Sequence, residues 1–270
     1  MSKLDIKNGL VQWGSDNSSQ DTEQPFSFDE NFTDIPMVVN TRTGEDSENT
    51  LPILRADKSM FYIDRKDSIN RNERFHWFAV ASNQNGGTKV ATIEDGKGNA
   101  VGKIQWGSST SSKDGDQSFS FHQSFSKNCA FVITNRNKKG VEDIMPVISK
   151  NTGSFTVNRN DGISGDESFS WIAIGDVEMD NNTFSIDFGD KFTMKGGRAK
   201  SSSDNAQSYT FTSLGLEPFS NSCDIVLTQR TAKNAECVMP VTEEDKNFFT
   251  CNRDGTIDGE EYFDWIAIGK

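Results

Sequence analysis

Arginines recur at two positions of the chain with a constant spacing of 94 residues. The first set is Arg42, Arg136 and Arg230, and the second set is Arg65, Arg159 and Arg253. Carboxylates stand just after the second set, at Asp67, Asp161 and Asp254. Guanidinium donors beside carboxylate acceptors can hydrogen-bond a polar ligand such as a sugar through its hydroxyl groups. These nine residues are therefore the candidate binding residues.

Each arginine set also has an interpretation without a ligand. A glutamate follows the second set by eight residues each time, at Glu73, Glu167 and Glu261, so an ion pair across a hairpin is the alternative. No acid stands eight residues after an arginine of the first set. Those arginines are expected in loops just after a strand, and the alternative there is a solvated side chain or an ion pair between repeats.

Residue patterns typical of catalysis are missing from the sequence. It has no Ser-His-Asp set, Cys-His pair or glycine-rich nucleotide loop, so we expect neither an enzyme nor a cofactor or metal site. The two histidines, His76 and His122, are expected at the surface. Cys129 and Cys223 share one repeat position and are expected as small core residues, whereas a bridge between Cys237 and Cys251 stays open.

The charge balance narrows the classes of partner. Lys+Arg total 28 and Asp+Glu 40, which gives a net charge of −12 and disfavours nucleic acid or an anionic membrane surface as the ligand. No apolar run is long enough to span a bilayer, and residues 1–7 contain no apolar core of a signal peptide. Localisation stays open between cytoplasmic synthesis with non-classical release and association with a virion or surface.

The chain contains three similar units. Trp77, Trp171 and Trp265 close them in the contexts WFAVA, WIAIG and WIAIG, and Pro52, Pro146 and Pro240 keep the same spacing. Trp13-Gly14, Trp106-Gly107 and Phe188-Gly189 open them. We predict domains at 1–82, 98–176 and 177–270. The polar linker 82–98 includes Lys89–Ile93, which has the residues of a short strand.

Each unit has the pattern of an antiparallel β-sandwich. Segments such as 117–121, 130–134 and 155–159 are short, alternate or are β-branched, and are bounded by Gly, Asn, Asp or Ser. Segments 155–159 and 167–175 are predicted to form a hairpin. No stretch has sustained helical periodicity, so the predicted fold class is all-β, with three tandem antiparallel sandwiches.

The closing strand is apolar on both faces. In Trp171–Ile174, Trp171 and Ala173 can face the unit's own core, as can the equivalent tryptophans, while Ile172 and Ile174 point the other way. A strand that is apolar on both faces is buried on both. We therefore expect the three units to pack on one another around a pseudo-threefold axis, with Trp13 and Trp106 also in the core.

The opening Trp-Gly, Phe-x-Phe, the GSFTVNRND stretch and the closing WIAIG resemble the H-type lectin domain of snail agglutinin and the C-terminal domain of discoidin. The pattern is also similar to the receptor-binding domain at the C-terminus of phage tail fibres. The resemblance implies six-stranded antiparallel sandwiches that form trimers, with galactose or N-acetylgalactosamine bound near the trimer interface in the lectins.

Two functions follow as expectations. The first is a carbohydrate-binding lectin or adhesin-like protein that recognises cell-surface glycans or glycoproteins through the arginine sets and their polar neighbours. The second is a non-catalytic building block of a fibre, virion or coat. An oligomer beyond the internal trimer is compatible with both.

Overall fold

The computed structural model describes residues 2–19, 22–43, 51–64, 72–112, 114–136, 145–159, 166–202, 205–230, 239–252 and 261–270. Strands make up nearly all the regular structure in these ranges, with one short 3-10 helix at Thr212–Leu214. The prediction of an all-β sandwich fold is confirmed. No helix in the described ranges is long and apolar enough to cross a membrane.

The strands fall into three consecutive groups. The N-terminal segment contains β1 (Lys3–Ile6), β2 (Gly9–Ser18), β3 (Glu23–Ser27), β4 (Met37–Thr43), β5 (Ile53–Ala56), β6 (Met60–Asp64) and β7 (Glu73–Ser82). The middle segment contains β8 (Val90–Glu94), β9 (Ala100–Ser111), β10 (Gly115–Ser120), β11 (Ala130–Arg136), β12 (Val147–Lys150), β13 (Ser154–Arg159) and β14 (Glu167–Gly175). The C-terminal segment contains β15 (Thr183–Asp187), β16 (Thr193–Ser201), β17 (Ala206–Thr210), β18 (Cys223–Arg230), β19 (Val241–Glu244), β20 (Phe248–Asn252) and β21 (Glu261–Gly269).

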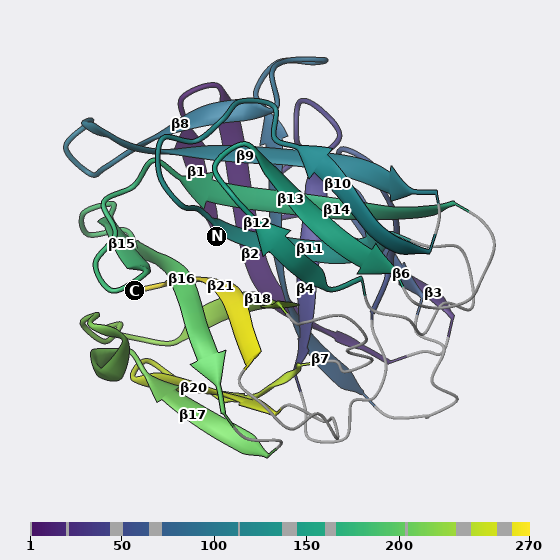
Figure 1. The fold of residues 1–270 in the computed structure, drawn as a ribbon. Helices are drawn as coiled ribbons and strands as arrows, with labels where there is room; N and C mark the ends of the chain where they lie inside the picture. The colour runs from purple at the N-terminus through teal and green to yellow at the C-terminus, as the bar shows by residue number, and fades with distance from the viewer. Residues whose placement is uncertain are drawn as a thin grey trace.

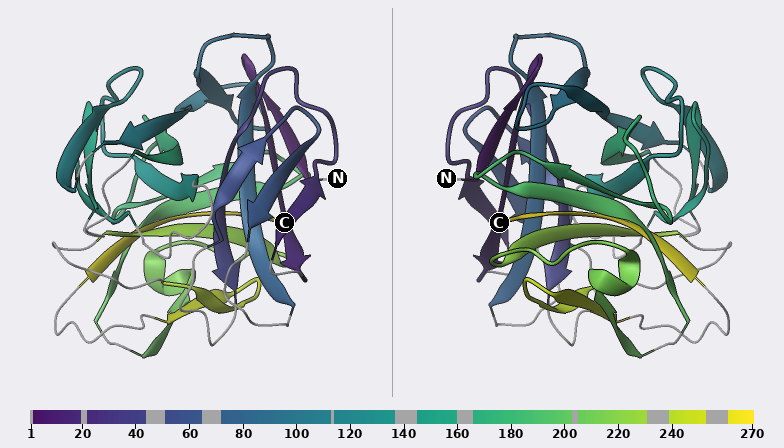
Figure 2. Two further views of the ribbon diagram at one scale, coloured as in Figure 1. Left: turned by 90° about the vertical axis from the view of Figure 1, so that its right-hand side faces the viewer. Right: turned by 90° about the vertical axis from the view of Figure 1, so that its left-hand side faces the viewer.

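Each segment pairs its strands in the same order. Four strands run β1-β2-β7-β4, β8-β9-β14-β11 or β15-β16-β21-β18, and three run β3-β6-β5, β10-β13-β12 or β17-β20-β19. All of these pairs are antiparallel, and one parallel pair, Val241 with Thr43, joins β19 to β4. The three groups lie side by side in Figures 1 and 2.

Two details of the predicted organisation differ from this topology. Among the described residues each segment has seven strands, one more than the six implied by the resemblance, because β1, β8 and β15 add an edge strand to the larger sheet. β8 confirms the short strand expected within 82–98, and it pairs with β9. A middle domain that begins at residue 98 therefore omits one of its own sheet strands. The three domain boundaries otherwise stay predictions.

The predicted hairpin of 155–159 with 167–175 is wrong. β13 pairs with β10 and β12, whereas β14 pairs with β9 and β11, so the connection crosses between the two sheets of the sandwich. The crossing places each strand in the sheet where its apolar face meets the core. Phe155 and Trp171 still meet there, with ring centroids 5.6 Å apart.

The opening of the C-terminal segment also differs from the prediction. Gly14 lies opposite Trp77 and Gly107 opposite Trp171, and the residue opposite Trp265 is Gly197. Gly196-Gly197 therefore takes the place assigned to Phe188-Gly189. The Phe184 ring fills the space of the missing tryptophan, since a Cβ on Gly196 would lie 2.7 Å from it.

Each segment encloses its own aromatic core. Trp77, Trp171 and Trp265 lie in three separate buried clusters between the two sheets of their segments, as the sequence predicts. Ala173 lies beside Trp171 in the same cluster. These rings contact phenylalanines edge-on or tilted, an arrangement that stabilises beyond the area it buries.

A fourth cluster takes residues from all three segments. Ile172 and Ile174 are fully buried in it, together with Phe78 and Val80 of β7 and Ile266 and Ile268 of β21. Trp13 and Trp106 lie in the same cluster and are buried, as expected. The closing strands are therefore buried on both faces, as their pattern predicts.

Candidate functional site

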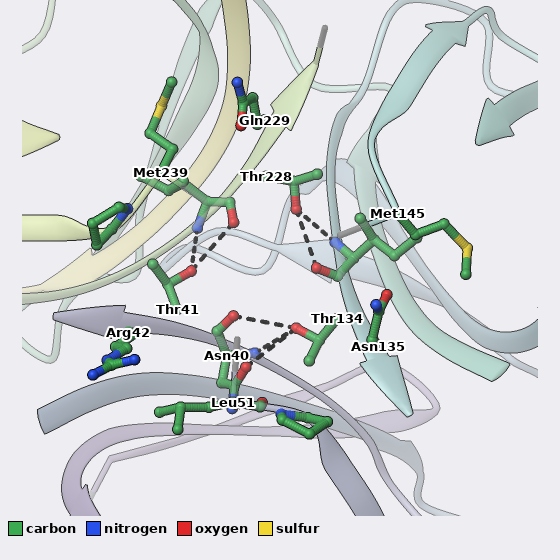
Figure 3. Close-up of a pocket in the computed structure, with 14 residues that line it drawn as sticks. Asn40, Thr41, Arg42, Leu51, Thr134, Asn135, Met145, Thr228, Gln229 and Met239 are labelled. Carbon is green, nitrogen blue, oxygen red and sulfur yellow. Dashed lines mark hydrogen bonds between the residues drawn. The ribbon is translucent and has the colours of Figure 1, made fainter. Parts of the chain in front are cut away.

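A pocket of about 90 Å³ lies where β4, β11 and β18 approach one another (Figure 3). Each segment contributes a threonine, the residues immediately before and after it on the strand, and a leucine or methionine from the next strand connection. The lining residues are Asn40, Thr41, Arg42, Leu51, Pro52, Ile133, Thr134, Asn135, Met145, Leu227, Thr228, Gln229, Met239 and Pro240. Its walls are thus partly apolar, with amide and hydroxyl groups between them.

Three threonine hydroxyls tie the segments together at this pocket (Figure 3). Each hydroxyl accepts from a backbone N–H of a neighbouring segment at 2.8–2.9 Å and donates to the carbonyl of that same residue at 3.2–3.3 Å. The pairs are Thr134 with Asn40, Thr228 with Ile133, and Thr41 with Leu227. We call this arrangement the threonine ring.

The strand register shows that Arg42 is not equivalent to Arg136 and Arg230, so the prediction of one set of three equivalent arginines is wrong. Arg42 lies opposite Phe75, and the residues in its place are Asn135, opposite Phe169, and Gln229, opposite Phe263. The cause is the connection after β4. Thr43 is eight positions before Leu51, whereas Arg136 is nine before Met145. Between the first two segments, the spacing of 94 therefore applies only after this connection.

Arg42 is buried in an ion pair with Glu73. Its Nε donates to one carboxylate oxygen at 2.7 Å, and its Nη2 lies 2.7 Å from the other. Arg42 is therefore neither a solvated side chain nor part of an ion pair between repeats, because its partner lies in its own segment. Gln229, at the equivalent place, donates to Glu261. In these two segments, the recurring glutamate therefore accepts a hydrogen bond from the strand residue at the position of Arg42.

Arg136 differs from Arg42 and Arg159, the other candidate arginines whose side chains the structure describes. It lies at the end of β11, next to Asn135 of the pocket, and its side chain is half-buried. Within the described residues it has no hydrogen-bond or ion-pair partner. Burial lowers the pKa of its guanidinium. A partly desolvated cation without a partner is well suited to bind a polar or anionic ligand.

Arg159 is buried and committed to its own segment. Its Nε lies 3.2 Å from Asp114, and its Nη1 donates to the Ser111 carbonyl at 3.3 Å. The other candidates cannot be placed. Outside the described residues lie Arg65, Asp67, Asp161, Arg253, Asp254 and the side chain of Arg230. Sequence reasoning missed the threonine ring and Asn135 and Gln229, although the recurrence of polar residues just before Arg136 and Arg230 marks their place.

His76 is buried, which corrects the prediction of a surface histidine. Its Nδ1 lies 2.9 Å from Asp224 of β18, and its Nε2 lies 3.3 Å from Glu244 of β19. Burial alone would lower the pKa of His76, but the hydrogen bonds and charges of the two carboxylates outweigh it, so the pKa is raised. His122 is exposed, as expected.

This raised pKa predicts a pH-dependent contact between the N-terminal and C-terminal segments. The stabilisation is fully present below the pKa of an unfolded histidine, about 6.5, and is lost as the pH rises through the folded pKa. The melting-temperature difference between the wild type and a His76→Gln variant should therefore shrink from pH 6 to pH 9. A difference that stays constant or grows over this range would contradict the assignment.

Metal and thiol chemistry find little support in the described ranges. Those ranges hold no cluster of three His, Cys, Asp or Glu side chains that could bind a metal ion. Cys129 and Cys223 are buried core residues, as predicted, and burial raises the pKa of the Cys223 and Cys251 thiols well above the usual value. A buried neutral thiol is a poor nucleophile. Cys237, and with it the bridge to Cys251, lies outside the described residues.

The comparison with known families places a resemblance on the middle segment. Residues 104–176, from within β9 through β14, match the family model described as the C-terminal region of a putative gp53-like tail fiber protein. No curated protein matches the chain. The similarity of the middle segment to a tail fibre domain therefore supports a structural or receptor-binding fibre protein.

Proposed function

We propose that this chain is a non-catalytic receptor-binding protein of the tail-fibre type that binds cell-surface glycans at the pocket beside the threonine ring. Three similar units on one chain would take the place of the three chains of a fibre trimer. The observation that carries the binding role is Arg136, a half-buried guanidinium without a partner in the described residues, which follows the pocket residue Asn135 on β11.

The shared strand order supports three equivalent units. The residue before the closing tryptophan lies opposite Thr41, Thr134 or Thr228 in the three segments. Each of these threonines reaches a different neighbouring segment, so the bonds close a cycle. A cyclic, head-to-tail set of contacts is what a threefold arrangement requires.

The pocket chemistry supports a sugar rather than an apolar ligand. Sugars present hydroxyl edges and apolar faces, and the pocket is lined by the polar residues Asn135 and Gln229 beside apolar walls at Leu51, Met145 and Met239. Arg136 would add donors for hydroxyls or for the carboxylate of an acidic sugar. Weak binding of a single sugar would gain strength if many chains engaged one cell surface.

One observation favours the alternative of a building block without a ligand. The threonine hydroxyls and Arg42 are committed to bonds within the molecule, and these bonds would make this end of the body rigid. A rigid three-unit block suits a fibre or coat. The two functions differ in whether the wild-type chain binds glycans.

The binding role predicts a specific loss in an Arg136→Ala variant. Removing a charged hydrogen bond to a ligand costs roughly 1.5–3 kcal/mol, so glycan affinity should fall ~10–150-fold. The melting temperature should hold or rise slightly, because the side chain removed is a half-buried charge with no partner among the described residues. A glycan array followed by calorimetric titration of the best sugar measures the first effect, and thermal unfolding the second.

Arg55→Ala is the matched control, because Arg55 is exposed and pairs only with the exposed Glu23 and the Tyr62 ring in the described residues. Its affinity should equal that of the wild type. Wild-type affinity in Arg136→Ala would remove Arg136 from the site. A wild-type chain that binds no glycan would favour the building block.

A further inference from the structure

Two positions recur at the contacts between segments. The first, which we call the inner position, immediately precedes the closing tryptophan and is His76, Ser170 or Asp264. The second, the edge position, is the last residue of β5, β12 or β19 in the smaller sheet. It is Ala56, Lys150 or Glu244. The register confirms the edge positions as equivalent, because they lie opposite Phe61, Phe155 and Phe249.

The contact between the N-terminal and C-terminal segments joins a basic inner residue to an acidic edge residue. His76 is fully buried and lies 3.3 Å from Glu244, whose side chain is only 7% exposed. Asp224 adds a second carboxylate at 2.9 Å, and Arg74 lies 2.7 Å from Glu244 on the outer side. The histidine of one segment is thus held by carboxylates of the other.

The contact between the C-terminal and middle segments has the opposite polarity. Asp264 is the inner residue, and it forms an ion pair with the edge residue Lys150, with both side chains at most 2% exposed. Lys150 also donates to the Cys129 carbonyl, and Arg198 lies 3.4 Å from the second oxygen of Asp264. The acid and the base have changed sides relative to the first contact.

The third contact, between the middle and N-terminal segments, carries no charge at either position. Ser170 is the inner residue, buried at 1% exposure, and its hydroxyl lies 3.9 Å from the Met37 sulfur of β4. The edge residue is Ala56. A charge at either position would have no counterpart at the other.

We infer that these two positions form a pairing code by which each segment accepts only its own neighbour, which extends the three-unit arrangement proposed above. In the observed order every charged residue at the inner and edge positions meets its opposite. In the reverse order His76 would face Lys150, Ser170 would face Glu244, and Asp264 would face Ala56. If like segments of separate chains associated, Asp264 would face Glu244 and Lys150 would face Ser170.

The physical basis of the code is the cost of a buried charge without a counterion. Removing one partner of a buried pair is strongly destabilising, even where the pair itself adds little stability over apolar residues. Such pairs can therefore specify a partner without adding much to the overall stability. Each interface therefore accepts its neighbouring segment and excludes the other segments, whether they belong to this chain or to a second copy.

The code is tested in the full chain by copying the histidine–glutamate pair to the second interface. Lys150→Glu alone places a carboxylate against Asp264 and should lower the melting temperature by roughly 6–20 °C or prevent folding. Adding Asp264→His gives a histidine facing a glutamate, as in His76 and Glu244. The double variant should fold and recover at least half of the loss.

Lys103→Glu is the matched control, because Lys103 pairs with Asp176 at a partly exposed site of the same segment, and it should change the melting temperature by less than about 3 °C. A double variant no more stable than Lys150→Glu, or a Lys150→Glu chain as stable as the wild type, would overturn the code. Glycan binding does not enter this readout, so rescue in a chain that binds no sugar would contradict only the proposed ligand.

Discussion

An Ile174→Asp variant is expected to lose roughly 3–5 kcal/mol of unfolding free energy, because the new carboxylate would be buried without a partner. Ile174 is fully buried in the cluster shared by the three segments, where Val80 and Ile268 also lie. The carboxylate would therefore face apolar side chains of other segments. Urea unfolding, compared by midpoint and slope, measures the loss.

Ser118→Asp is the control for this substitution. Ser118 is exposed on β10 of the same segment, so a carboxylate there stays in water and should change stability by no more than about 0.5 kcal/mol. Equal stability of the two variants would show that β14 does not contribute its second face to a shared core.

Arg42→Ala is expected to cost about 3–5 kcal/mol, because it leaves the Glu73 carboxylate buried without its guanidinium. The two side chains are 2% and 5% exposed, and two close contacts of 2.7 Å join them. The loss should be largely recovered when Glu73→Gln is added, since the amide carries no charge. Chemical denaturation of the two single variants and the double variant gives the coupling energy between these residues.

The exposed ion pair of Arg55 with Glu23 provides the comparison, and Arg55→Ala should cost about 0–1 kcal/mol. If Arg42→Ala costs no more than Arg55→Ala, the ion pair of Arg42 with Glu73 does not stabilise the pocket wall. Arg42 is then again a candidate ligand-binding residue.

Residue alternation was sufficient to predict the layers of this fold. In the closing strand, Trp171 and Ile172 point to opposite faces. Because both side chains are large and apolar, each face of the strand must be covered. The same reasoning placed the three closing tryptophans in the segment cores. The edge strand β15, in contrast, contains Ser185 and Asp187 facing solvent and gave a weak signal.

The candidate site was harder to predict because it depends on register and on distant partners. Arg42 and Arg136 keep the spacing of 94, yet β4 still follows the spacing of 93 that relates Trp13 to Trp106. Only the hydrogen-bond pairing reveals which residues are equivalent. His76 lies between Phe75 and Trp77 in the sequence, and the carboxylate that it contacts, Asp224, is 148 positions away.

The central claim is that one chain supplies all three units of a single trimer-like body. Small-angle X-ray scattering of the full chain in solution tests it most directly. A compact body of this length should give a radius of gyration of about 18 Å. A value above about 25 Å, as three separate domains on flexible linkers would give, would contradict the shared core and the arrangement built on it.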